Sequence, residues 1–257
     1  MGVPAVRRGR AARVWPGCFV LAWLAACGSA SVAAAQASPT RPFRPGELAT
    51  YQVEFSGIGV GSGSIRVDTG EVIAGAPTWR LIFAVRGGIP FFRINDVMES
   101  WFDPIALVSH RFTQELREGP KRYSRHFDLL PAERRYVERG QAPAQSVAEP
   151  LDDASFLFFV RTQALEVGKT YEWDRYFKPE ANPIRATVVR RERIRVPAGT
   201  FDAVVLQPTF RTKGIFSEGG HAELWLADDS TRRVLQMKSR LSFGSLNLYL
   251  TSYTPGR

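Results

Sequence analysis

The chain has 257 residues, a formal net charge of +9 and two cysteines, Cys18 and Cys27. No cysteine follows Cys27, so the rest of the chain can form no disulfide and has no thiol chemistry. Four arginines lie before Gly28, and from Gly28 onward 30 basic and 25 acidic residues leave a net charge of +5. The basic residues form no cluster interleaved with aromatic side chains, so we expect no nucleic-acid partner.

The N-terminal segment has the pattern of a secretory signal. Four arginines precede an apolar run from Val14 to Ala26, which is shorter than the roughly 20 residues that span a bilayer. The stretch "LAAC" resembles a lipobox, in which Cys27 is acylated after removal of residues 1–26. The stretch "AAAQA" suits ordinary signal peptidase, which would remove residues 1–37. Either ending predicts export, to the periplasm or to a lipid anchor on the inner or outer membrane, with a flexible tether up to about residue 44.

The stretch "SGIGVGSGSIRV" (Ser56–Val67) raises the question of a nucleotide-binding loop. Its glycines are spaced by two, whereas a dinucleotide fingerprint needs glycines at i, i+2 and i+5 before a helix. The β-branched residues Ile65 and Val67 follow without a helical period. The stretch therefore predicts a β-hairpin, with glycine at a tight turn or where two backbones approach closely.

Residues 45–257 are predicted to form one β-rich domain. About a dozen short runs of strand-like residues alternate with turn signals. In chain order the expected strands are 47–55, 64–72, 78–87, 96–103, 106–116, 122–130, 133–140, 170–177, 184–196, 201–212, 221–228, 232–244 and 245–253.

One segment has a helical period instead. In "EPLDDASFLFFVRTQALEVGKT", Asp152 or Asp153 suits the N-cap and Gly168 suits the stop, which predicts a helix over Asp153–Glu166. The expected fold is mainly β: one large curved antiparallel sheet or open barrel, with this single helix packed on the concave side. The helix residues expected to face a ligand are Phe156, Phe159 and Val160.

Several stretches together resemble the bacterial family known as domain of unknown function 3108. They are "RPGELATYQVEFSGIGVGSGSIRV", "PLDDASFLFFVRTQALEVGKTYEW", "VRRERIRVPAGTFDAVVLQP" and "AELWLADDSTRRVLQMKSRLSFGSLNLYL", in an order that fits nearly all of Pro45–Tyr253. Val234–Leu235 stands where the family often has a proline-containing step, which is a small departure. The resemblance implies a secreted or envelope protein. It supplies no catalytic residues, because no activity is established for the family.

No local motif in the sequence carries catalysis or metal binding. The histidines form no H-E-x-x-H pattern, and the chain has no G-x-S-x-G. Paired aspartates fall at turns or helix starts, where they ordinarily bond their own backbone. We therefore assign no catalytic, cofactor-binding or metal-binding residue. The residues weighed for such roles are His110, His126, His221, Glu99, Asp103, Asp152, Asp153, Glu172, Glu223, Asp228 and Asp229.

Three functions stay open on the sequence alone. The first is a non-enzymatic envelope protein that binds a lipid or other apolar ligand between the helix and the sheet, which is favoured by the phenylalanines of the helix. The second is a scaffold in an envelope assembly, such as polysaccharide export or an outer-membrane complex. The third is a hydrolase acting on cell wall or glycan. The oligomeric state and the identity of the ligand are left open.

Overall fold

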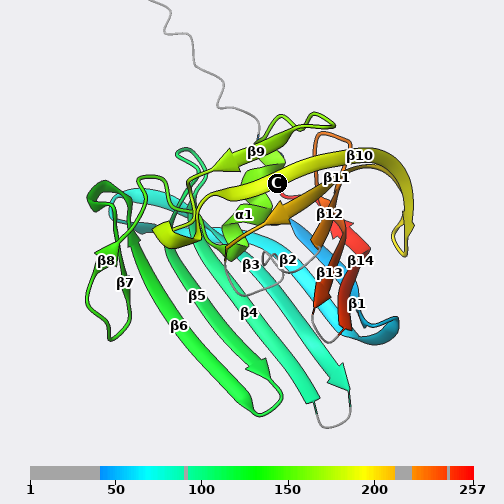
Figure 1. Ribbon diagram of the computed structural model, residues 1–257, viewed down its shortest axis with the longest axis horizontal. Coiled ribbons are helices and arrows are strands. Elements are labelled where there is room, and N and C mark those ends of the chain that lie inside the picture. The colour runs from blue at the N-terminus through cyan, green and yellow to red at the C-terminus, as the bar shows by residue number, and fades with distance from the viewer. Residues whose placement is uncertain (1–40, 90–91, 212–221, 242–243) are drawn as a thin grey trace, which may run out of the picture. The chain divides into compact units, whose positions relative to one another are not determined.

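The alternating apolar and polar runs of the sequence become strands of one antiparallel sheet (Figure 1). The computed structural model describes residues 41–89, 92–211, 222–241 and 244–257, which lie within one compact unit, 39–257. The N-terminal unit, 1–38, includes Cys27 and lies outside the described residues. In chain order the strands are β1 Leu48–Phe55, β2 Ile58–Ile73, β3 Ala76–Ile89, β4 Phe92–Asp103, β5 Val108–Glu118, β6 Lys121–Leu130, β7 Arg135–Glu138, β8 Ala144–Gln145, β9 Thr170–Trp173, β10 Ile184–Val196, β11 Gly199–Thr209, β12 Ala222–Ala227, β13 Val234–Leu241 and β14 Gly244–Thr254.

The strands form two meanders that are joined by the pairing of β1 with β14. The order across the sheet is β8-β7-β6-β5-β4-β3-β2-β1-β14-β13-β12-β11-β10-β9, so the first strand pairs with the last. In that junction Val53 of β1 lies opposite Leu248 of β14. Among the described strands β8 and β9 are the two edges, so the sheet is an open barrel rather than a closed one.

The glycine-rich stretch is a β-hairpin, as the sequence predicts. Ser56 and Gly57 have φ values of 49° and 84°, and Phe55 pairs with Ile58 around them. Two central residues with positive φ match the right-handed twist of the flanking strands, which is why this two-residue turn is favoured. No helix follows the turn, so the stretch lacks the strand-turn-helix geometry that a phosphate loop requires.

Farther along β2, Gly61 allows the backbones of β2 and β3 to approach closely. Gly61 lies opposite Gly87 of β3, and a Cβ added at Gly61 would stand 2.0 Å from the carbonyl oxygen of Arg86. A Cβ added at Gly87 would stand 2.2 Å from the carbonyl oxygen of Val60. The two strands therefore pack with no room for side chains at this pair.

The single α-helix is shorter than the sequence predicts. Helix α1 spans Asp153–Phe159 and continues only as the 3-10 turn η2, Val160–Thr162, so the expected extension to Glu166 is wrong. The side chains of Thr162 and Gln163 both donate to the carbonyl oxygen of Phe159, at 2.7 and 3.5 Å. They satisfy a carbonyl that a longer helix would have bonded in its own ladder. The other 3-10 turns are η1 Pro131–Glu133 and η3 Pro179–Ala181.

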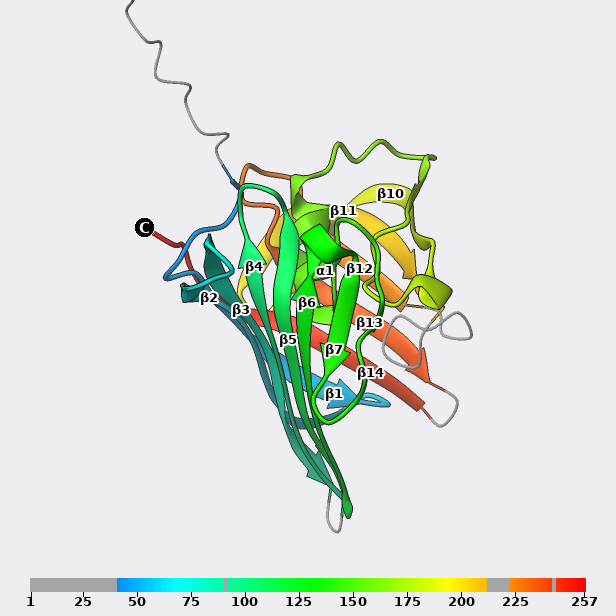
Figure 2. The same ribbon diagram turned by 90° about the vertical axis from the view of Figure 1, so that its left-hand side faces the viewer.

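The core lies between the helix and the inner face of the sheet. The two views place α1 inside the curve, between the half of the sheet that carries β3–β6 and the half that carries β10–β12 (Figures 1 and 2). Buried residues of both halves and of the helix form one apolar cluster. Every residue of α1 after Asp153 is buried, because a helix that is apolar around most of its circumference must be covered on most sides.

Candidate functional site

The start of helix α1 is fixed by a buried polar network. Asp152 is the N-cap, and its Oδ1 accepts from the backbone N–H groups of Ala154 and Ser155 at 2.9 and 2.8 Å. Its Oδ2 accepts from the Ser100 hydroxyl of β4 at 2.6 Å. Ser100 Oγ in turn lies 3.1 Å from Ser109 Oγ, which bonds Ser155 Oγ at 2.9 Å. The network therefore ties the helix to strands β4 and β5.

Burial dominates the electrostatics of this network. It raises the pKa of Asp152 to about 6, although the bonds from Ser100 and the helix N–H groups favour the charged form. Burial and then the charge of Asp152 also raise the pKa of Asp153, whose Oδ2 accepts from Tyr176 Oη at 3.1 Å. All four side chains of the network are fully buried, at 0% exposed, so a substrate has no access to them. They are Asp152, Ser100, Ser109 and Ser155. The cluster is a structural anchor.

The helix residues expected to face a ligand lie in the core. Phe156, Phe159 and Val160 are 1%, 3% and 0% exposed. The Phe156 ring stands edge-on to Phe210 at 4.7 Å, and the Phe159 ring stands edge-on to Trp173 at 5.4 Å. These side chains pack on protein partners, and their contact with a ligand stays a prediction.

The end of the helix is held by a buried ion pair that the sequence analysis missed. Arg161 donates to both carboxylate oxygens of Glu47, at 2.6 and 3.0 Å, and both side chains are 2% exposed. The same guanidinium donates to the carbonyl oxygens of Pro42 and Thr231 and lies 5.1 Å from the centre of the Phe43 ring. Two features of the sequence could have indicated this pair. They are the single charged residue within the apolar stretch "FLFFVRT" and the glutamate that ends "RPGE".

Past the helix, the inner face of the sheet carries apolar residues with polar ones between them: Asp96 lies between Ile94 and Met98 on β4, and Gln114 of β5 lies opposite Met98. Inward-facing residues there stay partly exposed although they pack against the core; we call Val60, Ile94, Met98 and Leu246 the distal inner strip. Met98 lies opposite the buried Phe83, and Ile94 lies opposite Gly87. Because side chains alternate along a strand, Ile94 and Met98 share the inner face of β4. Between them and β14, Gly61 and Gly87 contribute no side chains to the surface.

The extent of this surface follows from the lengths of the elements. Helix α1 has 7 residues and is therefore about 10 Å long. Strands β3 and β4 have 14 and 12 residues and are about 40 Å long or slightly more. The helix therefore covers only one part of the inner face, and Figure 1 shows β3–β6 running well beyond it.

The titratable residues weighed in the sequence do not converge. His110 and His126 lie on the neighbouring strands β5 and β6, but His126 pairs with Thr113, and its Nε2 is 3.3 Å from Asp128. His110 is 9% exposed with neither ring nitrogen bonded in the described part of the chain, and burial lowers its pKa. His221 lies outside the described residues.

The acidic residues have structural partners. Ion pairs join Glu99 to Arg80, Glu172 to Arg185, Glu223 to Arg190 and Asp228 to Arg191. Asp103 and Asp229 accept backbone N–H groups of their own turns. Within the described ranges no three potential metal ligands lie together. No helix found there is long and apolar enough to cross a membrane.

These features define an open antiparallel β-barrel-like protein whose inner face carries partly exposed apolar and polar side chains beyond a short buried helix. The chain belongs to the family described as "Protein of unknown function (DUF3108)", whose model matches residues 50–251. It is similar to a solved β-barrel-like protein of the domain of unknown function DUF1849 from Brucella abortus, with a TM-score of 0.55 and 9% sequence identity over 82% of this chain and 98% of that one. This likeness concerns the fold. No curated protein matches the chain.

Proposed function

We propose that this is an exported, non-enzymatic protein of the cell envelope that binds an apolar or amphipathic ligand, such as a lipid, against the distal inner strip. The observation that carries the proposal is the group of partly exposed apolar side chains on the inner face beyond the helix, with Asp96 between Ile94 and Met98. Phe156, Phe159 and Val160 are covered by protein side chains, so they would contact such a ligand only if those side chains moved. Covering the distal inner strip with an acyl chain gains about 25 cal/mol per Å² of apolar area removed from water.

The test compares two glutamate substitutions on one strand. Ile94→Glu places a charge on the inner face of β4, whereas Val97→Glu, which lies opposite Ala84, changes the outer face. Native mass spectrometry of the purified protein is expected to detect copurified lipid, and a fluorescent fatty acid is expected to bind. We expect Ile94→Glu to weaken fatty-acid binding at least about tenfold, because it desolvates a carboxylate against the ligand.

The outcomes separate binding from folding. Val97→Glu should keep the binding of the parent protein, and thermal unfolding should show that both variants remain folded. Parent protein that takes up no fatty acid and carries no lipid in the mass spectrum would overturn the proposal. Equal loss of binding in both variants would also contradict it, since the outer face would then matter as much as the inner one.

Membrane attachment is the second part of the proposal. The lipobox-like stretch that ends at Cys27 supports an acylated N-terminus, with a tether that starts at residue 28. The tether expected to reach about residue 44 ends earlier, because Arg161 bonds the Pro42 carbonyl oxygen and Phe43 is buried in the core. We expect the mature protein to begin at a lipid-modified Cys27 and to fractionate with membranes, and Cys27→Ser to abolish this attachment. Cys18→Ser, within the signal, should leave it intact. A mature N-terminus near Ser38 without added lipid mass would rule out the anchor.

A further inference from the structure

The outer face of strands β2–β5 carries arginines that fall into two groups. Those toward the helix end have carboxylate partners: Arg80 bonds Glu99 at 2.6 Å, and Arg66 bonds Asp68 at 2.9 Å. Arg111 bonds Glu71 at 2.5 Å and Asp128 at 3.1 Å. In this part of the sheet the positive charges are neutralised locally.

At the other end of the same strands the arginines are unpaired. Arg86, Arg93 and Arg117 are exposed, and none forms a side-chain ion pair or hydrogen bond with another described residue. Arg86 lies directly opposite Asn95, and Arg93 lies opposite Gly88. The β4–β5 pairs Val97–Glu115 and Ile94–Glu118 place Arg117 beside Asn95. Alternation along the strands therefore puts the three arginines on one face.

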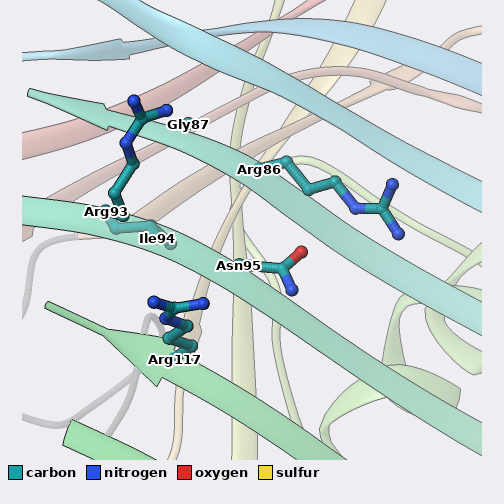
Figure 3. Close-up of a pocket in the computed structure, with 6 residues that line it drawn as sticks. All are labelled: Arg86, Gly87, Arg93, Ile94, Asn95 and Arg117. Carbon is teal, nitrogen blue, oxygen red and sulfur yellow. The ribbon is translucent and has the colours of Figure 1, made fainter. Parts of the chain in front are cut away.

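The three arginines surround a hollow of about 390 Å³. Its lining is Arg86, Gly87, Arg93, Ile94, Asn95 and Arg117. Figure 3 shows the side chains of Arg86, Arg93, Asn95 and Arg117 standing on three successive strands around it. The carboxylate of Glu115, two residues from Arg117, is already bonded by Ser124 Oγ at 2.5 Å.

We propose that this hollow binds a phosphate-bearing anion, as a lipid headgroup or as a free phosphate compound. Three like charges held close together on a rigid sheet repel one another, and a multiply charged anion removes that repulsion. The guanidinium group presents a planar fork of donors that matches phosphate oxygens, and the Asn95 amide adds a neutral donor. The three arginines lie on the outer face, whereas Ile94, which also lines the hollow, belongs to the distal inner strip, so the two proposed sites adjoin at this residue.

The test measures binding of the full chain to two probes. The first is vesicles of phosphatidylcholine with and without phosphatidic acid, and the second is glycerol 3-phosphate in solution. The variant Arg86→Gln/Arg93→Gln/Arg117→Gln is compared with Arg66→Gln/Arg185→Gln/Arg193→Gln, which removes the same charge at exposed arginines that have carboxylate partners. An arginine near an anionic surface contributes about fivefold in affinity, so the first variant should bind the acidic vesicles about 100-fold more weakly.

Each outcome decides the proposal. Loss in the first variant with retention in the second supports it; the vesicle arm then indicates a headgroup, and binding of glycerol 3-phosphate alone indicates a soluble compound. Equal loss in both variants would overturn it, since net charge alone would explain binding. Absence of binding to both probes would overturn it as well. Because the substituted residues are exposed, thermal unfolding should be unchanged in both variants, and fatty-acid binding to the inner face should persist.

Discussion

At the scale of single residues, the buried pair of Arg161 and Glu47 is the interaction most sensitive to substitution. Glu47→Gln would leave the guanidinium buried without a countercharge, and breaking such a pair costs about 3 to 5 kcal/mol. We expect the free energy of unfolding, measured in urea, to fall by this amount. The loss should appear as a lower midpoint concentration of urea. Arg161 also donates to the carbonyl oxygens of Pro42 and Thr231, so the substitution disturbs these contacts as well.

An exposed ion pair supplies the control for this prediction. Glu172 and Arg185 are joined at 2.6 Å, with side chains 53% and 38% exposed. Glu172→Gln should change stability by no more than about 1 kcal/mol, because water screens such pairs. If Glu47→Gln and Glu172→Gln unfold at the same urea concentration, burial does not govern the contribution of these pairs.

The pairing of Glu47 with Arg161 could not be predicted from the sequence. The opening "RPGE" is recognisable as part of the family resemblance, but its partner is 114 residues away. No periodicity relates two positions so far apart, and a single arginine in an apolar stretch is compatible with a solvent-facing side chain. Only the fold brings Glu47 and Arg161 together.

The close approach of β2 and β3 at Gly61 leaves no room for a side chain. Gly61→Ala would place a Cβ 2.0 Å from the carbonyl oxygen of Arg86, so the backbone of one strand would have to move. We expect a loss of about 1 to 3 kcal/mol in the free energy of unfolding. Gly59→Ala is the matched control, since its nearest neighbour, Gln52 Nε2, is 4.0 Å away. Comparable stability of the two variants in urea would refute the steric argument.

At the scale of elements, the anchored start of helix α1 predicts a dependence of stability on pH. The pKa of Asp152 is about 6 in the folded protein, against 3.8 for the unperturbed group. The folded state therefore holds this proton more tightly than the unfolded state. The contribution of Asp152 to stability is full below about pH 4 and is lost as pH rises through about 6, by about 3 kcal/mol in all.

The variant Asp152→Asn removes this titration and, with it, the charge of Asp152 that raises the pKa of Asp153. Asparagine is as good an N-cap as aspartate and stays neutral at every pH. The free energy of unfolding of the parent protein minus that of the variant should fall as pH rises from 4 to about 6. A difference that is flat, or that rises with pH, would show that the folded state does not hold the Asp152 proton more tightly.

The elements also show which local signals suffice and which do not. The hairpin within Ser56–Val67 and the N-cap at Asp152 or Asp153 are decided by neighbouring residues. The hairpin is confirmed, with its turn at Ser56-Gly57, and of the two aspartates Asp152 is the N-cap. The end of the helix depends instead on Arg161, Thr162 and Gln163, whose side chains bond distant or terminal carbonyl oxygens. Gly168, expected to stop the helix, lies in a later turn with φ of 86°. The apolar period continues past the true end and therefore predicts a longer helix.

At the scale of the whole molecule, the pairing of the first strand with the last makes one sheet from two meanders. The alternation of "SLNLYLTSY" predicts strand β14, with Leu248 and Leu250 on one face, and both are buried. The same pattern does not reveal its neighbours, because β1 lies about 200 residues away in the chain and any alternating strand could take that place. The curved sheet was predictable from composition and pattern, whereas its strand order was not.

The pairing of β1 with β14 predicts that the two meanders unfold cooperatively. Strand β14 pairs with both β1 and β13, so deletion of residues 244–257 creates two new sheet edges and uncovers Val53 of the core. We expect the truncated chain to lose its cooperative thermal transition in far-ultraviolet circular dichroism, because each half would expose part of the shared core. Deletion of residues 255–257 keeps β14 and removes the bond from the Arg257 N–H to the Pro45 carbonyl oxygen, so it should cost only about 1 kcal/mol. A cooperative transition at the original temperature after the larger deletion would mean that the two meanders fold as separate units.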